Sequence, residues 1–285
     1  MEKIGLVIEG GGLRGAYTAG ALCWLLDHDI TFDYGVGISI GALYLSAYMS
    51  QNQALLKEYS IDLAGSKNNV GIVPLLKEGT LVGYDNMFRQ VVENDCHIDI
   101  DVLNANPVRS EIGVYDLSTC ETVWISNDQI DAASLYIKAA CTLPMFGRKV
   151  NVNGIDYLDG GITTMIPINR SIINNNTKHF VITTKPKNYV RKPYSKLVLW
   201  LFKVVYRKYP KLAKDIAKRD KAYYDELNKI KDLVNNQEAI HVYPSADSGV
   251  TRFSGSIEQL QHLFDLGYND MEKRKVEINA FMNKE

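Results

Sequence analysis

The chain has 285 residues, of which 46% are hydrophobic and 23% are charged, and its formal net charge is −1 at pH 7. This composition is ordinary for a folded globular protein and leaves room for one large domain or two small ones. The near-zero net charge excludes a global field that would draw nucleic acid or a membrane to the whole molecule. We therefore expect no nucleic-acid partner.

The cysteine pattern indicates a reducing compartment. The four cysteines form no C-x-x-C pair, which argues against a zinc site and against a disulfide framework (Cys23, Cys96, Cys120 and Cys141). The N-terminus lacks the basic stretch and long apolar run of a signal peptide, and the longest apolar run, residues 197–202, is too short to span a bilayer. We expect a cytoplasmic protein with no metal and no cofactor; the sequence carries no signal for its oligomeric state.

The N-terminal half alternates short apolar runs with helical patterns. Residues 4–8 and 32–38 are typical of buried strands, and residues 16–26 and 40–49 have helical spacing. This alternation predicts a parallel sheet covered by helices on both faces. Further along the chain the patterns predict helices at 54–64, 84–92 and 132–141, and strands at 111–115, 122–126, 179–184 and 239–243.

Local signals mark turns and boundaries later in the chain. Asn153-Gly154, within residues 150–157, predicts a hairpin. Ser256 with Gln259 fits a capping box that opens a C-terminal pair of helices, and Gly267 is the expected break between the two. We divide the chain into a core, a basic helical segment, and a last strand with C-terminal helices (residues 1–185, 186–235 and 236–285).

A serine framed by glycines follows the second predicted strand, in the order Gly37-Ile38-Ser39-Ile40-Gly41. In such a strand-to-helix turn, glycines avoid clashes while the serine hydroxyl is lifted clear of the sheet at a helix start. Ser39 is therefore a candidate nucleophile, with Gly37 and Gly41 forming its elbow. The alternative is a serine that only caps the helix, with glycines that permit close packing.

A glycine-rich turn follows the first predicted strand, in the order Gly10-Gly11-Gly12-Leu13-Arg14-Gly15. Unpaired N–H groups at a helix start bind anions, and those of Gly11, Gly12 and Leu13 are candidate donors to a substrate oxyanion. A cation is poorly placed at a helix start. We therefore expect Arg14 either to fix the loop or to attract anionic headgroups.

The same turn permits a second interpretation. Gly10, Gly12 and Gly15 satisfy the dinucleotide fingerprint G-x-G-x-x-G. That fold places an acidic residue at the end of the second strand, where this chain has Ile38-Ser39. A non-catalytic dinucleotide-binding module therefore stays open as the weaker alternative.

A serine nucleophile needs a base, and no histidine lies in a segment shaped like a catalytic loop (His28, His97, His179, His241 and His262). Asp159-Gly160-Gly161 instead follows the predicted hairpin. An aspartate at a strand end, followed by two glycines, can approach another backbone closely. Asp159 is therefore a candidate base that would form a Ser–Asp dyad, and the alternative is an ordinary Asp-Gly turn.

Together and in this order, the three motifs resemble the signatures of the patatin-like phospholipase family. The resemblance covers about residues 4–185, including the segment from Ala132-Ala133-Ser134 to Leu143-Pro144-Met145-Phe146, and residues 253–268 resemble the C-terminal extension of bacterial members. It implies a three-layer α/β/α fold with a mostly parallel sheet and C-terminal helices, with residues 1–185 as the catalytic core. It also implies a Ser39–Asp159 dyad, an oxyanion loop at Gly10 to Gly15, and hydrolysis of lipid acyl esters.

These expectations describe a serine hydrolase of the phospholipase A, lysophospholipase or carboxylesterase type. A lipid acyltransferase is the alternative within this class, because an acyl-enzyme does not dictate its acceptor. A carboxylate base suits alcohol leaving groups better than amines, so we expect esters to be cleaved rather than amides.

Residues 185–221 carry thirteen Lys or Arg and only two Asp, interleaved with aromatic residues. A basic, aromatic, amphipathic helix is typical of peripheral contact with an anionic membrane. The equally weighted alternative is a solvated helix that packs Leu197, Leu201 and Val204 on the core. Nucleic-acid binding is a weaker third option, because the basic patch is local.

Overall fold

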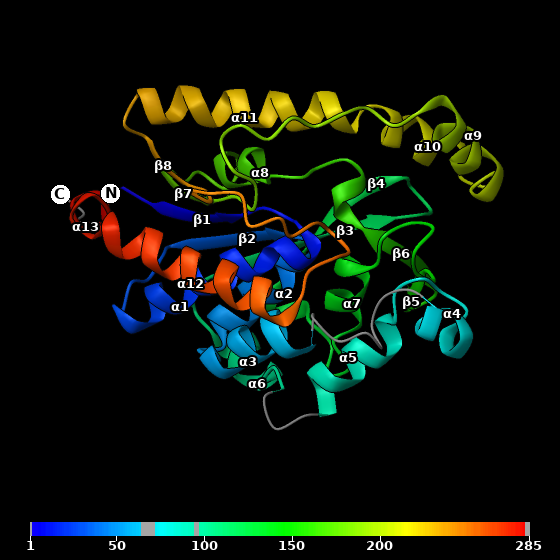
Figure 1. The fold of residues 1–285 in the computed structure, drawn as a ribbon, viewed down its shortest axis with the longest axis horizontal. Helices are drawn as coiled ribbons and strands as arrows, with labels where there is room; N and C mark the ends of the chain where they lie inside the picture. Colours follow the sequence, from blue (N-terminus) through cyan, green and yellow to red (C-terminus); the bar gives the residue numbers. More distant parts are fainter. Residues whose placement is uncertain (1, 64–71, 94–96, 283–285) are drawn as a thin grey trace.

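A sheet of eight strands forms the centre of the molecule (Figure 1). The structure is a computed structural model, and it describes residues 2–63, 72–93 and 97–282. The strands are β1 (Ile4–Ile8), β2 (Tyr34–Ile38), β3 (Ser110–Asp116), β4 (Glu121–Ser126), β5 (Val150–Val152), β6 (Ile155–Asp159), β7 (Lys178–Ile182) and β8 (Ala239–Val242). Their order is β5-β6-β3-β2-β1-β7-β8, and β4 pairs with β3. Pairs among β1, β2, β3, β7 and β8 are parallel, whereas pairs that involve β4, β5 or β6 are antiparallel.

Helices cover both faces of this sheet. They are α1 (Gly15–Asp27), α2 (Ile40–Met49), α3 (Gln53–Glu58), α4 (Ile72–Glu78), α5 (Tyr84–Glu93), α6 (Ile100–Ala105), α7 (Leu135–Cys141), α8 (Ile168–Ile173), α9 (Lys196–Val205), α10 (Pro210–Ala217), α11 (Arg219–Asn235), α12 (Ile257–Lys273) and α13 (Lys275–Met282). Figure 1 shows α8 and α11 on one face, and α1, α2 and α12 on the other. The three-layer α/β/α fold with a mostly parallel sheet and C-terminal helices is thus as the sequence predicts.

The alternating apolar positions of the strands supply two cores, one on each face. Val7 and Val36 point to the face covered by α11, where they belong to one cluster with Ile230. Leu6 and Ile8 point the other way, into the larger core beneath α1, α2 and α12. This period of two is what a sheet buried on both faces requires.

The expected elements are found, with shifts at their ends that have local causes. β2 begins at Tyr34 rather than residue 32, because the Asp33 carboxylate accepts the Ile4 amide at 2.8 Å beside the start of β1. β7 ends at Ile182 rather than Thr184, whose amide donates to the Glu9 carboxylate at 2.7 Å. The Asp131 carboxylate accepts the Leu135 amide at 3.0 Å, so α7 begins there rather than at residue 132.

Two further predictions have clear outcomes. The hairpin is confirmed, because β5 and β6 pair around Asn153 and Gly154, whose φ angles of 51° and 85° both lie in the left-handed region. The helix expected at 54–64 is α3 followed by a π-helical turn, Tyr59–Leu63, and residue 64 lies outside the described residues.

The expected helix break at Gly267 is wrong. The capping box of Ser256 and Gln259 opens α12 as predicted, but the helix continues through Gly267 and ends at Lys273. A Cβ at Gly267 would lie 2.1 Å from the Tyr17 carbonyl oxygen of α1, and a Cβ at Gly20 of α1 would lie 1.9 Å from the Phe264 carbonyl oxygen of α12. These glycines therefore let two helix backbones touch, and glycine serves here for close packing rather than as a helix stop.

α9 packs on its neighbours differently from the sequence expectation. Phe202 is buried in a cluster with Leu212 of α10, whereas Leu197 and Val204 are exposed. The alternative that Leu197, Leu201 and Val204 pack on the core is therefore wrong for Leu197 and Val204, whereas Leu201 is half-buried. Among the described helices, none is long and apolar enough to cross a bilayer.

Candidate active site

Ser39 occupies the sharp turn between β2 and α2. Its backbone has φ 57° and ψ −132°, a conformation that is strained for a residue with a side chain. A Cβ at Gly37 would lie 2.4 Å from the Gly41 carbonyl oxygen, and one at Gly41 would lie 2.7 Å from the Glu9 carbonyl oxygen. The turn therefore requires both glycines, and it places the Ser39 side chain at the N-terminus of α2.

The glycine-rich loop runs directly beside this serine. A Cβ at Gly10 would lie 2.8 Å from the Ser39 Cβ. Gly12 has φ 59°, and a Cβ there would lie 2.5 Å from the Arg252 carbonyl oxygen. Gly15 begins α1, where a Cβ would lie 2.7 Å from the Tyr44 ring. The loop can therefore pass between Ser39 and its neighbours only because Gly10, Gly12 and Gly15 lack side chains.

The loop amides differ in what they bind. The Gly10 amide donates to the Met165 carbonyl at 3.3 Å, and the Leu13 amide donates to the Arg252 carbonyl at 3.1 Å. The Gly15 amide donates back into the loop. Among the described residues, the amides of Gly11 and Gly12 have no partner. The amides of Gly11 and Gly12 therefore remain as candidate oxyanion donors. The Leu13 amide, which the sequence also predicts as a donor, is already bonded to the Arg252 carbonyl.

Asp159 ends β6 and is 1% exposed. Its Oδ1 accepts the Gly161 amide at 2.7 Å, and a Cβ at Gly160 would lie 2.5 Å from the Gly113 carbonyl oxygen of β3. Burial raises the pKa of Asp159, while hydrogen bonds from the Ser39 hydroxyl and the Gly161 amide oppose the shift. The structure thus brings together the serine and the carboxylate, and the raised pKa makes that carboxylate a stronger base.

Two histidines that are buried or half-buried make structural contacts. His179 shares a hydrogen bond of 2.9 Å with the Ser171 hydroxyl, and His241 shares one of 2.9 Å with the Thr183 hydroxyl. Burial lowers the pKa of both rings to about 4. No histidine of the described residues lines the cavities that contain Ser39.

Ser39 lies where two cavities of opposite character meet. One, of about 60 Å³, is apolar and aromatic, with walls that include Tyr44, Tyr59, Met87 and Leu143. The other, of about 20 Å³, contains the glycine loop and Asp159 and is lined by cations (Lys185, Arg191, Arg219 and Arg252). The site can therefore take an acyl chain on one side and a polar group on the other.

A buried ion pair holds the start of the glycine loop. Glu9 is fully buried, and its carboxylate accepts the Thr184 amide at 2.7 Å and pairs with the Lys185 ammonium. Burial lowers the pKa of Lys185 to about 8, and the charge of Glu9 opposes the shift. Glu226 of α11 accepts the Ile166 amide at 2.9 Å, beside the carbonyl to which Gly10 donates. These contacts fix the loop against β7 and α11.

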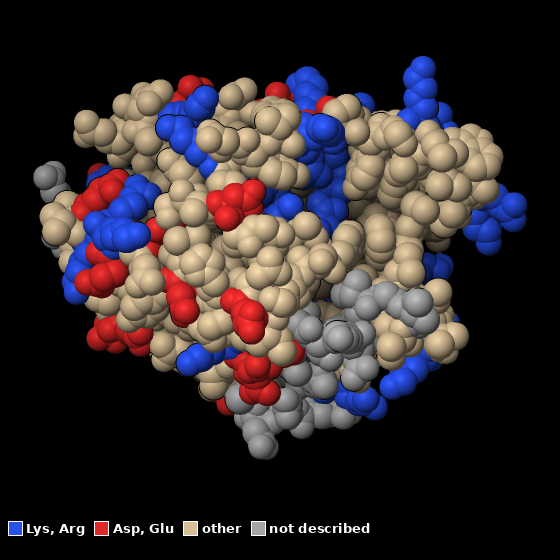
Figure 2. Space-filling model, in the orientation of Figure 1, with Lys and Arg blue, Asp and Glu red and all other residues tan. Residues whose placement is uncertain are grey.

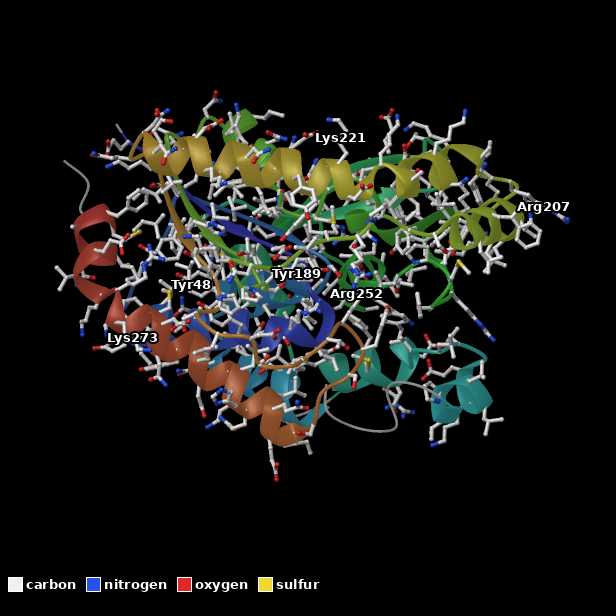
Figure 3. The ribbon with its side chains drawn as sticks, turned by 45° about the horizontal axis from the view of Figure 1, so that its top comes forward. Tyr48, Tyr189, Arg207, Lys221, Arg252 and Lys273 are labelled. Carbon is white, nitrogen blue, oxygen red and sulfur yellow. The ribbon has the colours of Figure 1, made fainter. Side chains whose placement is uncertain are left out.

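Arg252 is the functional candidate that the sequence did not indicate. It lies in the chain ahead of α12, far from the motifs along the sequence, yet it lines both cavities at Ser39. In Figure 3 it lies near Tyr189 at the centre of the molecule, while Arg207 lies at the far end. A lone arginine in a loop has no sequence signature. The sequence indicates Arg191 and Arg219 only as members of the basic segment, residues 185–221, and not as residues of the site.

Comparison with known protein families identifies the class of protein to which this fold and this site belong. Residues 6–171 match the family model described as patatin-like phospholipase. The chain therefore belongs to the patatin-like phospholipase family. Residues 209–283 match a second model, described as a domain of unknown function (DUF6363). The second match includes Arg219 and Arg252.

Individual relatives extend the comparison. The chain is 26% identical over 206 residues to the uncharacterized protein YjjU of Escherichia coli strain K12, across 70% of this chain and 57% of that protein. The chain thus spans little more than half the length of this relative. Among solved structures, VipD from Legionella pneumophila matches with a TM-score of 0.51 and 14% identity, across 96% of this chain and 66% of VipD. At this identity the likeness concerns the fold.

Proposed function

We propose that this protein is a serine hydrolase that cleaves acyl esters of lipids, with Ser39 as the nucleophile and Asp159 as the base. The observation that carries the proposal is the meeting of Ser39, the buried Asp159 carboxylate and the free amides of Gly11 and Gly12 in one cavity. Family membership supports the same activity.

The geometry supports a two-step reaction. The Ser39 Oγ attacks the ester carbonyl carbon while Asp159 takes the hydroxyl proton, and the amides of Gly11 and Gly12 hold the oxyanion. As the C–O bond to the leaving group breaks, Asp159 gives the proton to the departing alkoxide. Water then attacks the acyl-enzyme, Asp159 takes a proton from it, and Ser39 regains its hydroxyl as the acid leaves.

The cavity walls favour a lipid acyl group. The aromatic and aliphatic side chains around Tyr44 and Met87 would take the acyl chain, because apolar burial is worth about 0.8 kcal/mol per CH₂ group. The contact between Gly10 and the Ser39 Cβ favours this function over dinucleotide binding, since it puts the loop at a nucleophile.

We also propose that α9 docks on an anionic membrane surface. Leu197, Trp200, Val204 and Val205 are exposed on it, with Trp200 56% exposed. Lys196 and Lys203 are exposed on the same helix, Arg207 and Lys208 are exposed just after it, and Figure 1 shows α9 at one end of the molecule. An apolar helix face rimmed by cations matches a lipid interface that carries negative charge.

Titrated hydrolysis of short- and medium-chain p-nitrophenyl esters tests the proposed reaction. We expect Ser39→Ala and Asp159→Asn to lose at least about 10³-fold in kcat, since each removes one half of the dyad. Asp156→Asn is the matched control and retains activity, because this half-buried carboxylate earlier on β6 pairs with Lys149 rather than facing Ser39. Equal activity in all four proteins would overturn the proposed dyad.

A further inference from the structure

A larger cavity of about 360 Å³ opens next to the site. Its walls carry four arginines, Arg14, Arg191, Arg219 and Arg252, together with aromatic side chains that include Tyr194. Figure 2 shows Lys and Arg atoms recessed between neutral surfaces beneath α11. The reaction proposed above makes no use of these cations.

The arginines are gathered without matching carboxylates. Among the described residues, none of the four arginines forms an ion pair, although Asp220 also lines the cavity. The Arg14 Nε donates to the Val250 carbonyl at 3.0 Å, and the Arg14 guanidinium lies 5.5 Å from the Tyr189 ring centroid. The cavity is thus strongly cationic, and such surroundings attract an anion.

Arg219 gives the second, independent observation. It is 6% exposed, and its Nε is buried without a hydrogen-bond partner within the described part of the chain. Its Nη1 donates to the Tyr194 hydroxyl at 3.0 Å. Burial, with the charges of Arg252 and Arg191, lowers the pKa of Arg219 to about 10. A buried guanidinium with no carboxylate partner, whose Nε–H lacks an acceptor, is costly, so this position indicates a missing anionic partner.

The three buried or half-buried arginines also reach the proposed reacting centre. Arg191, Arg219 and Arg252 line both this cavity and the small cavity that contains Ser39 and Asp159. An anion held there would lie a short distance from an ester carbonyl at Ser39. Because planar guanidinium groups bind phosphate oxygens in pairs, a phosphate group is the anion that this cluster fits best.

We infer that Arg191, Arg219 and Arg252 form a binding site for a phosphate group carried on the leaving side of the ester substrate. This inference rests on the proposed function only in placing the phosphate on a substrate of Ser39. The acyl chain then enters the apolar cavity and the phosphate enters the arginine cavity, with the scissile ester between them. Acyl esters with a phosphate head are thereby preferred over neutral esters of equal chain length.

A matched substrate pair tests this preference. The kcat/KM for a monoacylglycerol phosphate is divided by that for the monoacylglycerol of the same chain, in wild type, Arg191→Gln and Arg252→Gln. We expect a ratio above one that falls at least about tenfold in each variant, the effect of losing one charge-assisted hydrogen bond. Lys273→Gln, on the exposed end of α12 and well apart from Arg252 in Figure 3, keeps the wild-type ratio.

Binding to Ser39→Ala separates this inference from the proposed reaction. Calorimetric titration with inorganic phosphate and with the monoacylglycerol phosphate, each repeated in Ser39→Ala/Arg252→Gln, reads the arginine site without turnover. The inference is supported if Ser39→Ala binds the monoacylglycerol phosphate more tightly than inorganic phosphate and if Ser39→Ala/Arg252→Gln loses this binding. This holds even if wild type hydrolyses neither ester. Phosphate binding with a substrate ratio of one would assign the site to a free ion and contradict the inference. If neither inorganic phosphate nor the monoacylglycerol phosphate binds, the inference is overturned.

Discussion

The Arg252 carbonyl oxygen accepts a hydrogen bond from the Leu13 amide at 3.1 Å. This bond joins the chain ahead of α12 to the glycine-rich loop, although the two lie far apart in the sequence. The Arg252 side chain meanwhile lines the cavities around Ser39. The C-terminal part of the chain therefore helps to build the candidate site rather than only covering the core.

Gly12→Ala tests how tightly this contact fixes the loop. An alanine would need φ near 59° and would put its Cβ 2.5 Å from the Arg252 carbonyl oxygen, so the loop must move. We expect ester hydrolysis to fall by about 10²-fold or more, as when one oxyanion donor is lost. The rate is measured on a neutral p-nitrophenyl ester.

Gly154→Ala is the control for Gly12→Ala. Gly154 has φ 85° in the β5–β6 hairpin, but apart from its chain neighbours no atom of the described residues lies within 4 Å of a Cβ added there. It carries the same kind of backbone strain, worth about 1–2 kcal/mol, without the clash. We expect near-normal activity, and equal losses in both variants would contradict the assigned role of Gly12.

The raised pKa of Asp159 predicts a pH dependence. Asp159 can take the Ser39 proton only when it is ionised, so activity falls as the pH drops through its pKa. Because burial raises this pKa above the usual 3.8, the fall begins at a higher pH than for an exposed aspartate. We expect the acid limb of kcat/KM for a neutral ester to have its midpoint above pH 3.8. A midpoint at or below pH 3.8 in a folded protein would be incompatible with this base.

Close packing of α1 on α12 predicts a large effect of Gly267→Ala on stability. In a free helix this change would stabilise by about 1 kcal/mol. Here the new Cβ would lie 2.1 Å from the Tyr17 carbonyl oxygen, so we expect a loss of about 3 kcal/mol in the free energy of unfolding. Urea denaturation measures it. Gly255→Ala, whose Cβ would have Val250 and Leu260 side-chain atoms as its nearest neighbours at 3.3–3.5 Å, should change stability by less than about 1 kcal/mol.

The exposed face of α9 predicts salt-sensitive membrane binding. Wild type should co-sediment with vesicles that contain phosphatidylglycerol and release at high salt, because screening weakens exposed charges. Trp200→Ala and Lys203→Gln should each bind more weakly. Lys273→Gln, on α12, is the charge control and should bind as wild type does. If Trp200→Ala and Lys203→Gln bind the vesicles as well as wild type does, α9 is not part of the membrane interface.

The sequence predicts the features that depend on residues close together in the chain, and it does not predict those that depend on residues far apart. The Ser39 turn, the Asn153-Gly154 hairpin and the Ser256 capping box each depend on residues a few positions apart, and their patterns are visible in the chain itself. Gly267 was misinterpreted because its role depends on Tyr17, some 250 positions away, rather than on its helix. Arg252 was missed for the same reason, since only the folded chain puts it beside Gly12.

Covalent labelling of Ser39 tests the proposed nucleophile most directly. A fluorophosphonate reacts with an activated serine by forming an Oγ–P bond as fluoride leaves, and mass spectrometry locates the adduct. We expect one adduct on the peptide that contains Ser39, slower labelling of Asp159→Asn, and none at this peptide in Ser39→Ala. Ser46→Ala removes another hydroxyl of α2, which donates a hydrogen bond to the Ala42 carbonyl one turn before it. This variant should label as wild type does. An unlabelled Ser39 in the folded wild-type protein, or equal labelling of Ser39→Ala, would contradict the assignment of Ser39 as the nucleophile.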